Sequence, residues 1–347
     1  MNRVIPPCLL LLFNFLLVNA QQDNSYKITA IGFYNLENLF DTVDDTLIND
    51  EEFLPNGKNT WTQDKYEEKI GNMAFAISQI AHEQLPSGVS VLGVSEIENQ
   101  KVLEDLVAHS LLKDRNYQIV HRNSPDRRGV DVAMIYNPSH FTPTKTTMFP
   151  LIFLNEEGER EFTRDVMMVE GDFDGEKMAF LINHWPSRGG GEERTAYKRN
   201  KCAQVCRQVI DSLYAQDPNT KAFIMGDLND DPTSPSIKVW LRAKSRTSET
   251  KENGLFNPME DLYKRGNGSL AYRDNWSLFD QIILTYPLIN KNSNGYHFLR
   301  ANVFNKSFLI QTTGQYKGYP FRTFSGNTYQ GGYSDHFPTY VYLAKKV

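Results

Sequence analysis

The chain has 347 residues, of which 40% are hydrophobic and 23% are charged, and its formal net charge is -5. This composition is typical of a soluble globular protein, and the sequence contains no internal repeat or low-complexity segment. The acidic charge argues against a protein that coats nucleic acids in general. Basic residues gathered around one site would still allow it to degrade polyanions.

Residues 1–20 have the features of a cleaved secretory signal peptide. Arg3 supplies a positive charge, the run from Cys8 to Val18 is almost wholly apolar, and Ala20 is a small residue at the expected cut. The alternative is a membrane anchor, but this run is too short to span a bilayer comfortably. No other segment is apolar enough to cross a membrane. We therefore expect a secreted or periplasmic protein without stable membrane insertion, formed by a single domain over residues 21–347.

The first half of the chain alternates strands with helices. A strand is predicted by β-branched and aromatic residues over Tyr26–Phe33, before a polar, acidic loop over Glu37–Thr60. Thr62 fits the N-cap of a helix whose apolar residues recur at helical spacing. The next expected elements are a strand over Val89–Val94, a helix over Val102–Leu112, and two paired strands over Tyr117–His121 and Val130–Tyr136.

The second half repeats this mixture of hairpins and strand-helix-strand units, which favours mixed sheets covered by helices in one domain. Its expected strands cover Val166–Gly171, Lys177–Ile182, Ala222–Met225, Leu278–Leu284 and Thr339–Leu343, with helices over Glu192–Tyr214 and Ile237–Leu241. Cys202 and Cys206 are four residues apart on the long helix, a spacing that favours two core thiols over a disulfide. The segment Lys244–Asn257 is polar and is expected to be flexible.

Short polar motifs follow several of these strands. Glu96 comes directly after a buried strand, where a carboxylate is a natural ligand for Mg²⁺, and Asn35 follows the first strand. Asp227 and Asn229 are two residues apart, so in extended backbone they point the same way and could align a water and hold a phosphate. Each residue also has an ordinary interpretation, as a solvated acid or a turn residue.

His184 ends another strand and precedes a glycine-rich, basic segment. A single histidine at a strand end is more often structural than catalytic. However, Arg188 lies in the following loop and Arg199 on the next helix, where glycine and a helix start both favour a bound anion. Together with Arg127 and Arg128, these arginines are candidate phosphate contacts in an otherwise acidic chain.

Two further candidates lie near the C-terminus. Asp280 is an acid within an apolar strand, and burying it is costly unless it is paired. Asp335 and His336 come just before the last strand. His336 would be a fitting partner for Asp280, because a carboxylate orients the ring and supports its charged form.

Taken in order, these motifs resemble the pattern of the endonuclease/exonuclease/phosphatase superfamily, which includes pancreatic-type deoxyribonucleases, abasic-site endonucleases, sphingomyelinases and inositol polyphosphate phosphatases. The resemblance extends from Lys27 to Leu343. The stretch from Arg128 to Ala133, and the pairing of Trp276 with Asp280-Gln281, look especially like the secreted bacterial nuclease-like branch. The matching positions are Asn35, Glu96, His184, Asp227 with Asn229, Asp280, and Asp335 with His336.

The resemblance implies a four-layer α/β sandwich in which two mixed sheets face each other with helices outside. It also implies Mg²⁺ or Mn²⁺, with Ca²⁺ as a further option, held mainly by Glu96 with Asn35 and Asp335 nearby. Asp227 and Asn229 would position the attacking water and the phosphate, and His184 would steady the phosphate or the leaving group. His336, paired with Asp280, would act as an acid/base or polarise the phosphate, and the role of general base stays divided between Asp227 and His336.

The leading hypothesis is an exported, divalent-metal-dependent phosphodiesterase, expected to be a monomeric nuclease that hydrolyses DNA or RNA. A phosphatase or a sphingomyelinase-like phospholipase is the alternative within enzymes, and the aromatic-rich segment Phe304–Tyr333 keeps a lipid substrate open. A binding protein that retained the fold without catalysis is a third hypothesis. The segments Asp41–Asn59, Lys244–Asn257 and Leu288–Gly318 match no substrate-selecting loop, so the substrate stays open.

Overall fold

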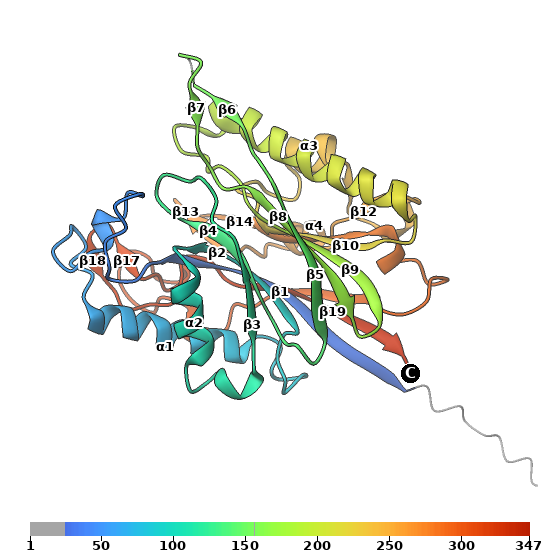
Figure 1. Cartoon of the computed structure of the whole chain (residues 1–347), viewed down its shortest axis with the longest axis horizontal. Coiled ribbons are helices and arrows are strands. Elements are labelled where there is room, and N and C mark those ends of the chain that lie inside the picture. The colour runs from blue at the N-terminus through green and yellow to red at the C-terminus, as the bar shows by residue number, and fades with distance from the viewer. Residues whose placement is uncertain (1–24, 156) are drawn as a thin grey trace, which may run out of the picture.

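Two β-sheets packed face to face form the centre of the computed structural model, which describes residues 25–155 and 157–347 (Figure 1). Helices cover the outer face of each sheet, so the expected four-layer α/β sandwich is confirmed. Residues 1–20, the expected signal peptide, lie outside the described residues, and the division into a leader and one domain stays a prediction. Within the described ranges, no helix combines the length and apolar character needed to cross a bilayer.

The first sheet joins strands from both ends of the described chain. β1 pairs with β2 in parallel and with β19 antiparallel, so that Phe33 lies opposite Thr339 near the C-terminus. The strand order is β16 (His297–Val303), β19 (Thr339–Lys346), β1 (Tyr26–Leu39), β2 (Val91–Ile97), β4 (Asp131–Tyr136) and β3 (Gln118–His121).

The second sheet is built around β9 and β10, which run parallel because the long helix α3 (Glu192–Gln216) connects them. β8 and β9 form the expected hairpin, whose turn contains Asp174 and Gly175. The strand order is β11 (Ala243–Lys244), β12 (Leu255–Phe256), β15 (Asp280–Thr285), β10 (Lys221–Asp227), β9 (Glu176–His184), β8 (Val166–Phe173) and β5 (Phe141–Phe149).

Alternation along the strands places the hydrophobic core on both faces of each sheet. On β1, Ile31 and Phe33 point into the layer between the sheets, whereas Ala30 and Tyr34 face the helices α1 (Gln63–Gln79) and α2 (Gln100–Ala108). The second sheet packs its outer face on α3, where Cys202 and Cys206 are buried free thiols, as expected.

Short elements extend the loops at the ends of the sheets. The described part of the chain contains one further helix, α4 (Met259–Lys264), a π-helical turn over Ser236–Trp240, and 3₁₀ turns over Glu51–Phe53, Lys113–Arg115, Thr247–Glu249, Tyr286–Leu288 and Ser307–Leu309. The remaining strands form hairpins of two strands each: β6 (Phe153–Leu154) with β7 (Arg160–Glu161), β13 (Leu270–Tyr272) with β14 (Asn275–Ser277), and β17 (Phe324–Ser325) with β18 (Thr328–Tyr329).

The sequence pattern missed strands at the edges of the sheets. β5 and β16 are edge strands, and β5 contains Pro143, where its register with β8 shifts. Proline cannot donate a ladder hydrogen bond and is tolerated at an edge, so its presence hid the strand. The expectation of a flexible segment over Lys244–Asn257 is wrong at its ends, because they belong to β11, which pairs with β12, and to β12, which pairs with β15.

Candidate active site

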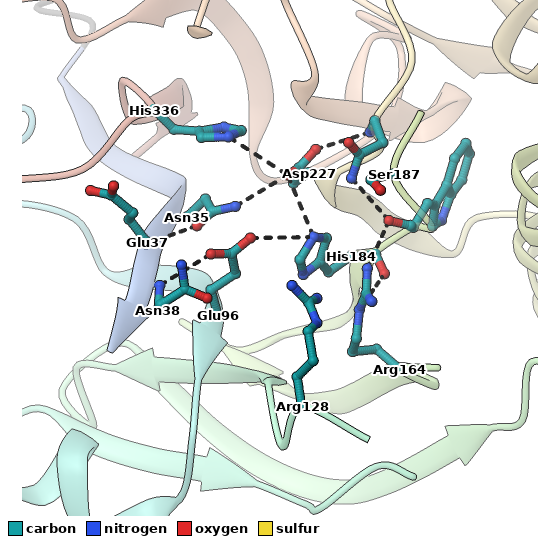
Figure 2. A network of polar contacts seen from close by, with 12 residues as sticks. Asn35, Glu37, Asn38, Glu96, Arg128, Arg164, His184, Ser187, Asp227 and His336 are labelled. Carbon is teal, nitrogen blue, oxygen red and sulfur yellow. Dashed lines mark hydrogen bonds and ion pairs between the residues drawn. The ribbon is translucent and has the colours of Figure 1, made fainter. Parts of the chain in front are cut away.

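The polar residues at the strand ends meet at one end of the two-sheet core. In the second sheet, Asp227 on β10 stands directly opposite His184 on β9 and Asp280 on β15. Asn35 and Glu96 reach the same place from β1 and β2 of the first sheet (Figure 2). The fold therefore gathers residues that are far apart in the sequence.

A β-bulge directs Glu96 into this site. The register of β2 with β4 shifts between Ser95 and Ile97, and Glu96 has a φ of 58°, in the left-handed region that few residues other than glycine adopt. The backbone N–H of Asn38 donates to Glu96 Oε2 at 3.1 Å. Such backbone strain costs about 1–3 kcal/mol and is concentrated at functional sites, where the surrounding structure holds it in place.

Glu96, His184 and Asp227 form a group that fits a divalent cation. Glu96 Oε1 lies 3.7 Å and Asp227 Oδ2 lies 3.6 Å from His184 Nε2, and the three ligand atoms are all within 4.8 Å of one another. These separations exceed ordinary hydrogen-bond lengths, so the atoms converge without bonding to each other. Carboxylate oxygens are the ligands that Mg²⁺ prefers, with water and substrate phosphate completing its shell.

The side-chain amide of Asn35 and the backbone N–H of Asn229 hold the buried carboxylate of Asp227. Asn35 Nδ2 donates to Asp227 Oδ2 at 3.1 Å, and the backbone N–H of Asn229 donates to Asp227 Oδ1 at 2.9 Å. Asn229 Nδ2 in turn donates to the carbonyl of Trp185 at 2.9 Å. Burial raises the pKa of Asp227 to about 7, with His336 opposing the shift and Asp280 adding to it. A carboxylate with that pKa can exchange a proton near neutral pH.

His336 and Asp280 form the buried pair that the sequence suggested. Asp280 Oδ2 lies 2.7 Å from His336 Nδ1, and both side chains are buried. Burial alone would lower the pKa of His336, but the carboxylates of Asp280 and Asp227 outweigh it and hold that pKa well above its usual range. His336 therefore keeps its positive charge, and its Nε2 lies 3.9 Å from Asp227 Oδ2.

His184 differs from His336 in what shifts its pKa, because burial has the largest effect and the charges that add to it are cationic. Burial, followed by the charges of Arg164, Arg128 and His336, holds the pKa of His184 well below its usual range. His184 is accordingly neutral while His336 is charged. The two histidines thus have different capacities for proton transfer, set by their neighbours.

Arg164 is a buried residue that the sequence pattern did not single out. Its guanidinium donates to the carbonyls of His184 at 3.2 Å and Trp185 at 2.9 Å, and to Asp126 Oδ2 at 2.9 Å. It fixes the backbone at the end of β9, where His184 enters the site. No local signal marked it, because it lies in an ordinary polar stretch and its partners come from other segments.

Glu37 and Lys69 form a second buried group that was not predicted. Thr323 N–H donates to Glu37 Oε2 at 2.6 Å, and Lys69 Nζ donates to Thr323 Oγ1 at 2.7 Å and to the carbonyl of Tyr333. Burial raises the pKa of Glu37 to about 7 and lowers that of Lys69 to about 8. The group ties α1 to the loop that carries Asp335. The available signal in the sequence was Lys69 itself, because it lies one helical turn before the core residue Met73 and is therefore expected to be buried.

Asp335 lies outside the group of Glu96, His184 and Asp227. Its side chain is 31% exposed, and its carboxylate is 3.9 Å from both His336 Nε2 and the guanidinium of Arg322. Its expected part as a metal ligand, like that of Asn35, stays a prediction.

The four predicted phosphate-binding arginines divide into two pairs. Arg127 and Arg128 are exposed and line a cleft of about 700 Å³ whose floor includes Glu96, His184 and Asp227. The other two arginines do not line this cleft.

The expectation for Arg188 and Arg199 is corrected by the structure, because carboxylates already hold their guanidinium groups. Arg199 is fully buried, with its Nε 2.8 Å from Asp230 Oδ1. Arg188 lies 3.2 Å from both Asp230 and Asp231 and donates to the carbonyl of Asn229. Both arginines stabilise the loop after β10, with their guanidinium groups paired to carboxylates.

Replacing Asp280 by asparagine is expected to shift the alkaline limb of the pH profile of kcat/KM to lower pH. Asp280 favours the charged form of His336, so its removal lowers the pKa and the imidazolium is lost earlier as pH rises. Asp261→Asn, at an exposed acid on α4, is the matched control and should leave the limb in place. An active Asp280→Asn enzyme with an unmoved limb would contradict this role.

Comparison with known proteins agrees with the fold and with the family that the sequence resembles. A family model described as "Endonuclease/Exonuclease/phosphatase family" matches residues 30–345. Among curated proteins, no sequence matches this chain.

An endonuclease/exonuclease/phosphatase family protein from Bacteroides thetaiotaomicron has a TM-score of 0.55 and 17% identity, covering 93% of this chain and 97% of that one. A mannosyl-6-phosphatase from the same organism has a TM-score of 0.53 and 16% identity, with coverages of 91% and 99%. D. rerio TDP2 complexed with single-strand DNA product has a TM-score of 0.51 and 13% identity, with coverages of 91% and 98%. At these identities the likeness concerns the fold.

Proposed function

Because the chain belongs to the endonuclease/exonuclease/phosphatase family, whose members hydrolyse phosphoric esters, we propose that it is a divalent-metal-dependent phosphodiesterase acting on nucleic acid. The observation that carries the proposal is the convergence of Glu96, His184 and Asp227 on one point at the floor of a cleft. Mg²⁺ or Mn²⁺ is the proposed cation, and Glu96 is its proposed main ligand. When bound, it would supply charge neutralisation at the phosphate and lower the pKa of a coordinated water.

In the proposed mechanism, Asp227 takes the proton of the attacking water. The two candidates for this role were Asp227 and His336, and their surroundings separate them. Asp280 and Asp227 hold the pKa of His336 well above its usual range, which favours its charged form and supports a role as donor rather than base. Asp227, with a pKa of about 7, can accept a proton near neutral pH.

His336 donates to the phosphate in this mechanism. Its Nδ1 is engaged by Asp280, so its Nε2–H is the hydrogen that faces the cleft. A charged donor in a buried site stabilises the negative charge that develops on the phosphate oxygens in the transition state. Asn35 and Asn229 hold Asp227 in position, and neutral His184 provides a donor or acceptor beside the reacting group.

The basic wall of the cleft supports nucleic acid as the substrate. Arg127 and Arg128 are exposed beside the reacting groups, although the whole chain is acidic. Phosphate contacts from arginine provide much of the affinity of proteins for nucleic acids. A phosphomonoester or a phospholipid headgroup remains the alternative that the assay below separates.

Export and a monomeric state complete the proposal. The basic, apolar and small-residue segments of residues 1–20 support secretion or delivery to the periplasm. N-terminal sequencing of the protein recovered outside the cytoplasm tests the cut after Ala20, and light scattering tests the monomer.

The main test is hydrolysis of plasmid DNA, RNA, sphingomyelin and inositol phosphates by the protein starting at residue 21, with Mg²⁺, Mn²⁺, Ca²⁺ or chelator. We expect nicking of DNA or RNA that requires the metal and falls by about 10²–10³-fold in His336→Ala, the loss typical of a transition-state donor. Glu96→Gln should need a higher metal concentration for the same rate. Hydrolysis confined to sphingomyelin or inositol phosphates would contradict the nucleic-acid substrate, and equal rates with chelator would contradict metal dependence.

A further inference from the structure

The hairpin of β6 and β7 forms a wall of the active-site cleft that the proposed chemistry does not use. Phe153 on β6 pairs with Glu161 on β7, and both residues line the cleft together with Arg160 and Phe162. In Figure 1 this hairpin extends beyond the sheets, next to the start of α3. The cleft therefore continues from the reacting groups along a surface with its own side chains.

Phe162 holds two arginines on this wall. The guanidinium carbon of Arg160 lies 4.9 Å from the centroid of the Phe162 ring, and that of Arg127 lies 5.5 Å from it. The ring is 40% exposed, so solvent and ligands can reach the group. Stacking on an aromatic ring restricts a guanidinium while leaving N–H donors at its edge for an anion.

The charges of Arg127 and Arg160 are not neutralised by ion pairs with the residues that the structure describes. By contrast, Lys198 is paired with Glu161, and Arg164 is paired with Asp126 at 2.9 Å. Glu159 also lines the cleft, with its carboxylate 3.4 Å from the side-chain amide of Asn155. The positive charge left along this wall is thus concentrated on the two arginines beside Phe162.

We propose that Arg127, Arg160 and Phe162 form a subsite for a second phosphate of a nucleic-acid strand, separate from the phosphate that is cleaved. This inference rests on the proposed function and narrows its substrate to phosphodiesters with more than one phosphate. Arg127 and Arg160 contact the second phosphate. Phe162 is a positioning residue, since it acts by holding both guanidinium groups in place before the strand arrives.

The test compares two substrates in the same variants. Bis(p-nitrophenyl) phosphate contains one phosphate, whereas a short single-stranded oligonucleotide contains several. For Arg160→Gln we expect the ratio of kcat/KM on the oligonucleotide to kcat/KM on the small diester to fall roughly tenfold, mainly through KM, as for loss of one charge-assisted hydrogen bond. Phe162→Leu, which retains both charges, should lower the ratio by a smaller factor. Arg246→Gln, at an exposed arginine in a different hollow, is the control and should not change it.

Binding of the same oligonucleotide, labelled with fluorescein and titrated in chelator, gives a readout that does not depend on catalysis. In Arg160→Gln, the slope of log affinity against log salt should become shallower by about 0.7, as for one lost contact to a single strand. Unchanged affinity and slope, or an equal loss on both substrates, would overturn the subsite.

The hydrolysis assays distinguish failure of the proposed function from failure of the subsite. If the wild-type protein hydrolyses neither substrate with any metal, the proposed function fails. The binding titration with the fluorescein-labelled oligonucleotide then still decides whether the two arginines bind the strand. If the small diester is hydrolysed while Arg160→Gln leaves the substrate ratio within twofold of wild type, only the subsite fails.

Discussion

Asp227→Asn is expected to lower kcat by roughly 10³-fold, the middle of the range expected for losing a general base. The substitution retains the shape of the side chain and its backbone contact with Asn229, but the amide cannot accept the proton of water at neutral pH. Burial penalises the charged carboxylate of Asp227, but the new amide nitrogen would face the Asn35 Nδ2 donor, so the free energy of unfolding of the variant is measured alongside its activity. Pre-steady-state hydrolysis of the small diester measures the loss in the chemical step.

The same variant separates two roles for Asp227, as a base and as a metal ligand. Mn²⁺ binding followed by calorimetry should show a smaller loss of affinity for Asp227→Asn than for Glu96→Gln, because Glu96 is the proposed main ligand of the group that converges on the cation. If Asp227→Asn loses Mn²⁺ affinity to the same extent as Glu96→Gln, Asp227 is a ligand and the base must be sought elsewhere. The distances allow this comparison because both carboxylates lie at similar separations from His184 Nε2.

Arg199→Ala is expected to lower the free energy of unfolding by about 3–5 kcal/mol, the usual cost of removing one partner of a buried ion pair. Asp230 would keep Ser236 and Arg188 as partners but would lose the fully buried cation next to it. The chemical midpoint of unfolding, measured with the slope of the transition, gives the value.

Two controls make this prediction specific. Arg242→Ala removes an exposed arginine paired with Asp211 and should change stability by less than about 1 kcal/mol. In the folded fraction of Arg199→Ala, the slope of substrate affinity against salt should equal that of the wild type, because Arg199 does not reach the cleft. A reduced slope with unchanged stability would restore Arg199 as a phosphate contact.

Local patterns predicted most of the central elements. Thr62 occupies the N-cap of α1, the Asp-Gly turn joins β8 to β9, and apolar runs mark β2, β10 and β15. These features succeed because periodicity and turn chemistry depend on neighbours along the chain. The prediction missed β5 and β16 because an edge strand has one partner and little burial. Its residues therefore need not show the alternation of hydrophobic and polar side chains.

The candidate site was foreseen in its residue types but not in its contacts. Placing an acid, an amide or a histidine after a strand is visible in the sequence, and the pairing of Asp280 with His336 followed from the cost of burying an acid. The partners of Arg188 and Arg199 were not visible. An arginine next to a glycine-rich loop looks the same whether its guanidinium faces solvent or Asp230.

The order of the main strands and helices, and the polar residues at the strand ends, followed from the sequence alone. Only the tertiary structure decided which of these residues share one site, which arginines are free for a substrate, and that a bulge directs Glu96 inward. The physical reason is the separation along the sequence over which each kind of interaction acts. Hydrophobic alternation and turn preferences act between near neighbours, whereas ion pairs and pKa shifts depend on side chains that folding brings together from distant segments.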